Sequence, residues 1–167
     1  YSGCCTIMVT HDPDEALELS DTIAIINAGH VSQTGSIESL LNRPLTKDVA
    51  MSFSGGQLLV GTREGNQVCT PCGTFEFQGN KTSSSVYVVV RPMGVVICTE
   101  PKKSSSPAKI VDIRLTGMGI NITLQVVGGT VRSFLIPLAG LEGRVTHKTG
   151  DQVHVYLDPR SCFVFDR

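Results

Sequence analysis

The sequence predicts a chain of the α+β class that is mainly β. Over residues 1–54 short β-branched runs alternate with capped helical segments, in the order strand, helix, hairpin, helix. Over residues 55–167 apolar residues recur with a period of two between glycine-rich turns, which predicts a small all-β barrel. At roughly a hundred residues this second part has a normal size for an independent core.

The composition is that of a globular chain and excludes several function classes. Of the 167 residues, 41% are hydrophobic and 17% are charged. The net charge of −1, the aromatic content of 5% and the absence of Trp argue against a nucleic-acid partner. No apolar stretch approaches the ~20 residues of a membrane-spanning helix.

The first element is a predicted strand, Thr6–Val9, which is followed by a histidine and a helix start. Asp12 is the expected N-cap, accepting from the backbone N–H three residues on, and Pro13 occupies the first turn, where proline is harmless. Glu15 can reach back to the cap. His11 is therefore either a histidine presented in a fixed direction or an ordinary loop residue beside a cap.

The remaining elements follow from turn and cap residues. Asn27-Ala28-Gly29 is the expected turn of a hairpin, and Ser36 and Thr46 are expected to cap two short helices. The predicted strands of the second part cover residues 58–62, 86–90, 95–97, 109–115, 121–126, 131–136, 153–157 and 161–165.

The segment from Thr10 to Gly35 carries a specific resemblance. It reads Thr-His-Asp-x-x-Glu-Ala-Leu, then Asp-Thr-Ile-Ala-Ile-Ile-Asn-Ala-Gly-His-Val. This resembles the switch-histidine segment of ABC transporter ATPases, in which the histidine contacts the γ-phosphate and the attacking water. The resemblance implies that residues 1–54 are the C-terminal end of an ATP-binding domain. It also implies that His11 is the catalytic switch histidine of the complete protein and that Asp12 orients its loop.

Other parts of such an ATPase are missing. The sequence has no Gly-x-x-x-x-Gly-Lys-Ser/Thr, and no apolar strand ending in Asp-Glu precedes His11. Phosphoryl transfer needs the phosphate cradle, the metal and the water-orienting group together. We therefore expect an ATPase that uses ATP and Mg²⁺ at the level of the complete protein. The chain by itself is expected to bind neither and to be inactive. The strand Thr6–Val9 would lie inside a parallel sheet of the complete protein, so in this chain we expect it to be frayed, repacked or swapped onto a second copy.

The segment Phe53–Gln57, Phe-Ser-Gly-Gly-Gln, looks like the Leu-Ser-Gly-Gly-Gln signature of the same family. In the family that signature precedes the histidine and opens a helix, whereas here it follows His11 and precedes a predicted strand. Two glycines that end a helix are the simpler interpretation.

The second part resembles the OB-fold-like C-terminal domain of importer ATPases. The motifs are Val90-Arg91-Pro92 and the run Gly150–Pro159, Gly-Asp-x-Val-x-Val-x-Leu-x-Pro. Such domains occur in importers of molybdate, sulfate, ferric iron, polyamines and sugars. The resemblance implies subunit pairing or regulation, a homodimer, transmembrane permease subunits as partners, and a position on the cytoplasmic face of the membrane. Met93-Gly94 depart from the family pattern, in which an acidic or histidine residue often follows Arg-Pro.

Two further possibilities are left open by the residues. The first is a module that senses an oxyanion such as molybdate or sulfate, for which Ser83–Ser85 and Thr116–Gly119 are the candidate donors. The second is zinc at Cys69 and Cys72, whose spacing suits a metal but lacks a second pair. Free buried cysteines are the alternative to zinc, and no metal site is expected.

Overall fold

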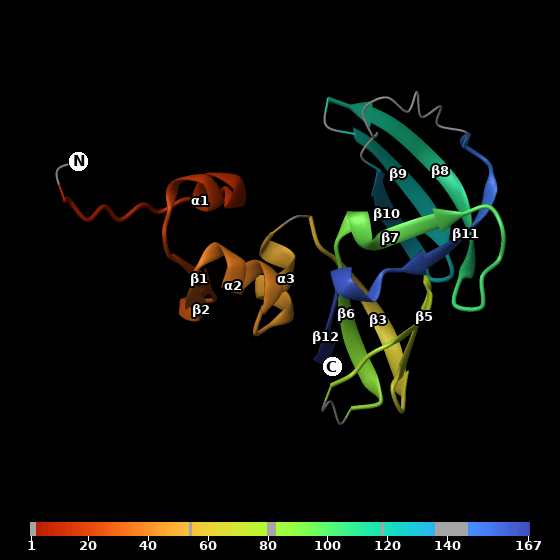
Figure 1. The fold of residues 1–167 in the computed structure, drawn as a ribbon, viewed down its shortest axis with the longest axis horizontal. Helices are drawn as coiled ribbons and strands as arrows, with labels where there is room; N and C mark the ends of the chain where they lie inside the picture. Colours follow the sequence, from red (N-terminus) through yellow and green to blue (C-terminus); the bar gives the residue numbers. More distant parts are fainter. Residues whose placement is uncertain (1–2, 54, 80–82, 118, 136–146) are drawn as a thin grey trace. The chain divides into compact units, whose positions relative to one another are not determined.

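The computed structural model describes residues 3–53, 55–79, 83–117, 119–135 and 147–167 (Figure 1). Contacts divide the chain into two compact units, Tyr1–Phe53 and Ser54–Arg167, and each unit has its own hydrophobic core. Strands dominate the second unit, so the predicted mainly β class is confirmed. In the described part of the chain no helix is long and apolar enough to span a membrane.

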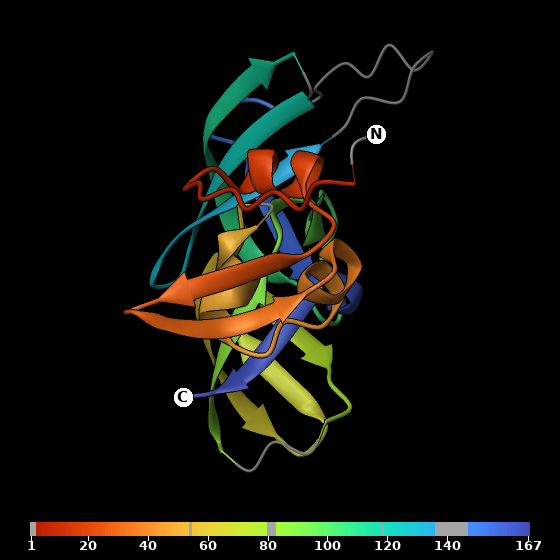
Figure 2. The ribbon, with the colours of Figure 1, turned by 90° about the vertical axis from the view of Figure 1, so that its left-hand side faces the viewer.

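Residues 3–53 of the first unit form three short helices and one hairpin. Its elements are α1 (Pro13–Leu19), β1 (Ile23–Asn27), β2 (His30–Gly35), α2 (Ile37–Asn42) and α3 (Lys47–Ser52). The antiparallel pair β1–β2 is seen side by side in Figure 2, and Ala28 and Gly29 form its turn with φ values of 49° and 78°. The small core of the unit contains Ile23, Leu40, Val49 and Phe53.

Local capping residues set the helix starts of this unit as expected. The Ser36 hydroxyl accepts from the Ser39 N–H at the start of α2, and the Thr46 hydroxyl accepts from the Val49 N–H at the start of α3. The buried Gln33 side chain joins the loop between the two helices, since its amide donates to the Arg43 carbonyl at 3.2 Å. Its oxygen accepts from the N–H of the loop residue at position 45, so both ends of the amide are satisfied.

The segment Thr6–Val9 forms no strand among the described residues, in agreement with the expectation that it is frayed where its sheet neighbours are absent. Ile7 and Val9 are 89% and 94% exposed, and no strand of the described residues pairs with this segment. A run this apolar is typical of a strand buried on both faces of a parallel sheet, which forms only between neighbouring strands. The segment is extended ahead of α1 (Figure 1).

The described residues of the second unit form ten strands and two short 3-10 helices. The strands are β3 (Gln57–Glu64), β4 (Gln67–Thr70), β5 (Gly73–Glu76), β6 (Ser85–Val90), β7 (Val95–Cys98), β8 (Ser106–Thr116), β9 (Gly119–Val126), β10 (Gly129–Leu135), β11 (Gln152–Leu157) and β12 (Cys162–Asp166). The turns are η1 (Pro92–Gly94) and η2 (Pro159–Ser161). Position 136, which was expected to end a strand, lies outside the described residues.

These strands form two five-stranded sheets rather than one continuous closed barrel in the described residues. The orders are β12-β6-β3-β4-β5 and β10-β9-β8-β11-β7. Every strand pair within them is antiparallel, so one face of each sheet can pack on the core while the other faces outward. Alternate residues of both sheets, such as Val86 and Val88 from β6 and Ile122 and Leu124 from β9, fill the shared core.

The hairpin β4–β5 was not expected from the sequence, where no alternating apolar run marks it. It turns tightly at Gly73, which has a φ of 111°. A Cβ atom at this position would collide with the backbone carbonyl of Ser104, whose oxygen also accepts from the Thr74 N–H at 3.0 Å. A glycine is needed here both for its backbone angle and for this close approach.

Candidate functional site

The loop that carries His11 leads directly into α1. The Asp12 carboxylate caps the helix by accepting from the Asp14 N–H at 2.9 Å, two residues on rather than the three that were expected. Both positions are ordinary targets of an N-cap side chain, and Pro13 lies in the first turn as predicted. Asp12 thus ties the loop to the first turn of α1.

The side chain of Thr10 contributes more to this loop than the sequence indicated. Its hydroxyl donates to Glu15 Oε2 at 2.6 Å and accepts from the Asp12 N–H at 3.0 Å. Glu15 therefore reaches back as expected, but it contacts Thr10 instead of the cap backbone. The signal that could have found this contact is a hydroxyl residue two positions before the N-cap of a helix with Glu at its third position.

His11 is exposed, and no hydrogen bond of its imidazole occurs among the described residues. The described part of the chain also contains no group of three or more His, Cys, Asp or Glu side chains that could hold a metal. The loop therefore presents a single imidazole without a phosphate cradle or a magnesium site around it. In this geometry His11 can donate to or accept from a ligand held by other groups.

The structure separates the two cysteines that had metal-ligand spacing. Cys72 is fully buried in the core of the second unit, whereas Cys69 is half-buried on β4, where its sulfur accepts from the Thr74 hydroxyl at 3.5 Å. Burial raises the pKa of the Cys72 thiol to about 12. In this structure the Cys72 side chain packs as a small hydrophobe among the core residues of the second unit.

The residues proposed for an oxyanion site lie far apart within the second unit. Ser83 precedes β6 and Thr116 ends β8, and these points lie at opposite ends of the unit (Figure 1). The Thr116 hydroxyl donates to the Gly119 carbonyl and accepts from its N–H, and the Ser83 hydroxyl donates to the Ser85 carbonyl. Position 118 lies outside the described residues. These hydroxyls serve their own turns and do not converge on one ligand.

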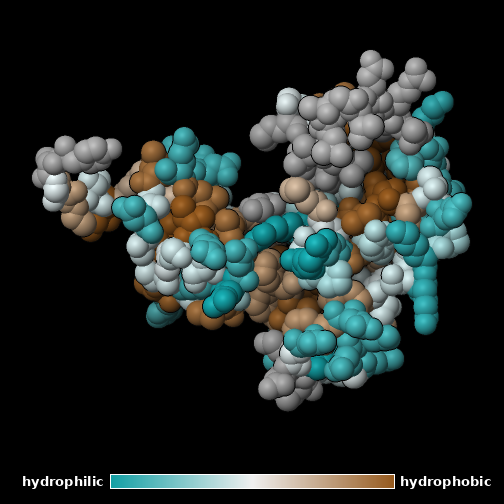
Figure 3. All heavy atoms as spheres, in the orientation of Figure 1, coloured by the Kyte–Doolittle hydropathy of each residue, from teal (hydrophilic) through white to brown (hydrophobic). Residues whose placement is uncertain are grey.

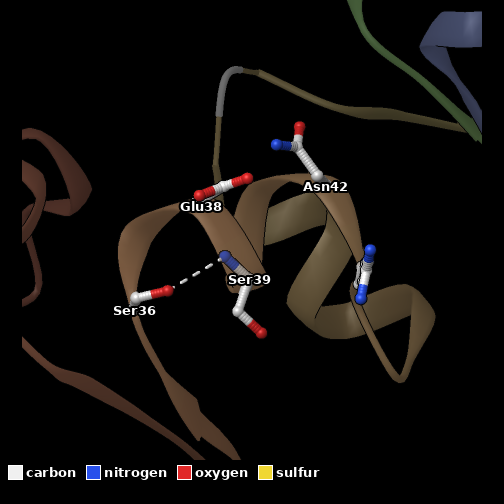
Figure 4. Close-up of a pocket in the computed structure, with 5 residues that line it drawn as sticks. Ser36, Glu38, Ser39 and Asn42 are labelled. Carbon is white, nitrogen blue, oxygen red and sulfur yellow. Dashed lines mark hydrogen bonds between the residues drawn. The ribbon is translucent and has the colours of Figure 1, made fainter.

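A shallow hollow lies along α2 in the first unit (Figure 4). Its lining side chains are Ser36, Glu38, Ser39, Asn42 and Arg43. The Ser36 hydroxyl accepts from the Ser39 N–H as the cap of α2. All of the lining residues belong to α2, which has six residues, or flank it directly. The hollow is therefore an open groove on the surface of this helix.

The outward face of β3, β6 and β12 is apolar. Strand pairing places Leu58, Val89 and Phe163 in one row and Val60, Tyr87 and Phe165 in the next. Leu58 is 38% exposed and Val60 is 46% exposed, Tyr87, Phe163 and Phe165 are half-buried, and Val89 is fully buried between them. Apolar atoms are visible at the surface over β6 and β12 in Figure 3. We call these six residues the β3-β6-β12 face.

Two arginines border the β3-β6-β12 face. The guanidinium of Arg91 lies 5.2 Å from the ring centroid of Phe163, and that of Arg167 lies 5.8 Å from the ring centroid of Tyr87. Cations over aromatic faces are attracted by the ring quadrupole, which holds these rings in place. Burial also lowers the pKa of Arg91. The face is therefore a preformed apolar surface with two cationic groups at its border.

A known domain family matches the second unit. Residues 88–165 match the model of the TOBE domain. This part of the chain is similar to TOBE domains. The match runs from β6 to β12 and so includes strands of both sheets. It also includes Arg91, Pro92 and the Gly150–Pro159 run, on which the resemblance to importer ATPases was based.

The chain is also similar to import ATP-binding proteins over most of its length. It is 31% identical over 149 residues to the spermidine/putrescine import ATP-binding protein of Trichormus variabilis, covering 81% of this chain and 39% of that protein. It is 26% identical to the molybdate/tungstate import ATP-binding protein of Pyrococcus abyssi, covering 98% of this chain and 48% of that protein. The sulfate/thiosulfate import ATP-binding protein of Thermosynechococcus vestitus is 30% identical, with 96% of this chain and 43% of that protein covered.

These matches confirm the resemblance to ATP-binding subunits of ABC importers with a C-terminal β-domain. The chain spans less than half the length of the curated relatives it matches. Among solved structures, the molybdate-bound form of the cytoplasmic molybdate-binding protein ModG is 14% identical with a TM-score of 0.49, covering 66% of this chain and 96% of that chain.

Proposed function

We propose that this chain acts as part of the ATP-hydrolysing subunit of an ABC importer, at the cytoplasmic face of the membrane and in contact with permease subunits. The observation that carries the proposal is the His11 loop, in a chain similar over 98% of its length to an import ATP-binding protein. In the complete subunit His11 contacts the γ-phosphate of ATP. Asp12 fixes the loop that carries His11 to the start of α1 by capping that helix.

The chemistry that His11 can supply is limited and specific. Its imidazole can donate a hydrogen bond to a γ-phosphate oxygen or accept one from the attacking water, which places a polar group where charge develops in the transition state. Mg²⁺, when bound in the complete subunit, neutralises phosphate charge. The described residues of this chain do not fit a magnesium site. In this proposal, other parts of the complete subunit hold the metal and form the phosphate cradle.

A substitution of His11 tests this role in the complete ATP-binding subunit assembled with its permease. We expect His11→Ala to lower the rate of ATP hydrolysis by about a hundredfold or more, because one positioned acid–base or hydrogen-bonding group contributes on that order. The matched control is His30→Ala, which removes an exposed histidine from the β1–β2 hairpin. Hydrolysis by the His11→Ala variant at the wild-type rate would contradict the proposal.

We further propose that the TOBE-like second unit pairs two copies of the subunit through the β3-β6-β12 face. The sheet order leaves β12 at an edge, and an edge strand offers backbone groups to a second chain. A symmetric pair brings the same apolar surface of both copies together, which removes it from water. Regulation through this domain would act by changing that pairing.

Charge introduced into the β3-β6-β12 face tests the pairing. We expect the wild-type chain to be a dimer by native mass spectrometry and light scattering, and Val60→Lys to be a monomer at the same concentration, because a lysine there must be desolvated in the interface. The control is Val111→Lys, which changes a valine of similar exposure, 39%, on β8 of the other sheet. A dimer with unchanged affinity in Val60→Lys would rule out this face.

A further inference from the structure

The hydrogen bonds around His11 form a chain that encloses this one residue. They run from the Asp12 N–H to the Thr10 hydroxyl, and from that hydroxyl to the Glu15 carboxylate. We propose that Thr10 and Glu15 are positioning residues for His11, holding the backbone that presents its imidazole. This inference rests on the proposed role of His11 in ATP hydrolysis.

The arrangement differs from an ordinary capping box. In a capping box the acidic side chain at the third helical position accepts directly from the N-cap N–H. Here Glu15 occupies that position, but the Thr10 hydroxyl lies between it and the N–H of Asp12. The hydroxyl has one proton, which it donates to Glu15, and its lone pairs are then free to accept from Asp12. Glu15 thereby sets the direction in which Thr10 accepts.

The consequence for His11 is that its backbone is held on both sides. Thr10 is bonded to α1 through Glu15, and Asp12 is bonded to α1 through the Asp14 N–H. The hydroxyl–carboxylate hydrogen bond has an ionised acceptor and a separation of 2.6 Å, which places it in the stronger class. Residues 3–10 form no helix or strand, so within this unit the bonds to α1 are what fixes the loop.

A purely structural role of Thr10 and Glu15 makes a different prediction. If they only stabilised α1, their loss would fray the helix, and any effect on hydrolysis would follow helix content. If they position His11, a variant with intact α1 and a loose loop loses kcat while its KM for ATP is unchanged, because a misplaced group costs transition-state stabilisation. The variants below separate the two roles.

The first measurement uses the present chain and its amide hydrogen exchange. We expect the Asp12 amide to exchange about three- to tenfold faster in Thr10→Val, since one hydrogen bond of ordinary net strength is lost. Thr10→Ser keeps the hydroxyl and is expected to restore slow exchange. Glu18→Gln changes another exposed carboxylate of α1 and serves as the control. Unchanged exchange of Asp12 in Thr10→Val would overturn the inference.

The second measurement uses the complete ATP-binding subunit with its permease. We expect Thr10→Val and Glu15→Ala to lower kcat for ATP about tenfold or more with little change in KM, and Thr10→Ser to retain the wild-type kcat. If His11→Ala abolishes hydrolysis but Thr10→Val leaves kcat unchanged, the positioning role is wrong and the proposed function stands. If His11→Ala itself leaves kcat unchanged, the proposed function fails and the positioning role fails with it.

Discussion

Burial decides the chemistry of the cysteines at the scale of single residues. Cys72 is fully buried, and its pKa is raised to about 12 by desolvation. The pKa of Cys162 is also raised to about 12, first by burial and then by the nearby charges of Asp158 and Cys72. Cys4 and Cys5 are exposed. Cys69 and Cys72, which have metal-ligand spacing in the sequence, therefore lie in different environments. Cys72 is buried in the core, whereas Cys69 is half-buried.

The raised pKa of Cys72 predicts a loss of stability at alkaline pH. The folded state keeps the thiol protonated up to about pH 12, whereas the unfolded thiol ionises with the ordinary cysteine pKa of 9.0. The stabilisation is fully present below pH 9 and is lost as the pH rises from there towards 12. Between pH 8 and pH 10 we expect this group to lower the unfolding free energy by about 1.4 kcal/mol.

Urea unfolding of the wild-type chain and of Cys72→Ala at these two pH values measures this contribution. The variant lacks the buried thiol, so its unfolding free energy is expected to fall less between them by about the same amount. An equal pH dependence of both proteins would show that the Cys72 thiol ionises alike in the folded and unfolded states.

At the scale of elements, the Gln57 side chain links the two sheets of the second unit. The Gln57 amide, at the start of β3, donates to the Arg132 carbonyl at 2.7 Å and accepts from the Arg132 N–H at 2.6 Å. The Ser133 hydroxyl donates to the Val95 carbonyl at 2.6 Å and is buried. β10 is an edge strand of its sheet, so Gln57 takes the place that a further strand would occupy there.

We expect Gln57→Ala to lower the unfolding free energy by about 1 kcal/mol, because two backbone groups of Arg132 lose their partner and only water can replace it. The Arg132 amide is expected to exchange faster in the same variant. Gln152→Ala, an exposed glutamine at the start of β11, is the matched control. Equal stabilities of the two variants would show that the Gln57 contact does not stabilise the fold. Urea unfolding and amide exchange by NMR are the measurements.

At the scale of the whole molecule, the two units differ in the size of their cores. Among the described residues, eighteen buried side chains form the core of the second unit and four form the core of the first unit. The free energy of burial grows with the apolar area removed from water, so the first unit has much less to stabilise it. Its exposed apolar side chains include Leu19, Ile26 and Val31.

We expect a protein comprising residues 55–167 to fold alone, with a cooperative urea transition and the same backbone NMR shifts as in the whole chain. The first unit is expected to unfold at lower urea, and its amides are expected to exchange faster, since few buried contacts oppose its opening. A single transition for the whole chain, together with an unfolded 55–167 protein, would show that the units depend on each other.

Structural features that depend on residues close together in the sequence were predicted correctly, whereas features that depend on distant residues were not. The caps at Ser36 and Thr46 and the turn at Ala28-Gly29 involve residues within three positions of each other, and each is present as predicted. The segment Thr6–Val9 is exposed and unpaired, as expected for a strand-forming run without its neighbours, because a strand needs a partner that its own residues do not encode. The hairpin β4–β5 was missed since its residues lack a regular apolar alternation.

By itself the sequence determined the mainly β class, the helix starts, the resemblance to importer ATP-binding subunits and the histidine that merits testing. Only the tertiary structure decided that Cys72 enters the core while Cys69 does not, that Gln57 meets Arg132 at a separation of 75 residues, and that the strands form two sheets. Caps, turns and motifs are local and can be read from neighbouring residues. Burial and long-range pairing depend on which faces of the sheets meet, and only the folded chain defines those faces.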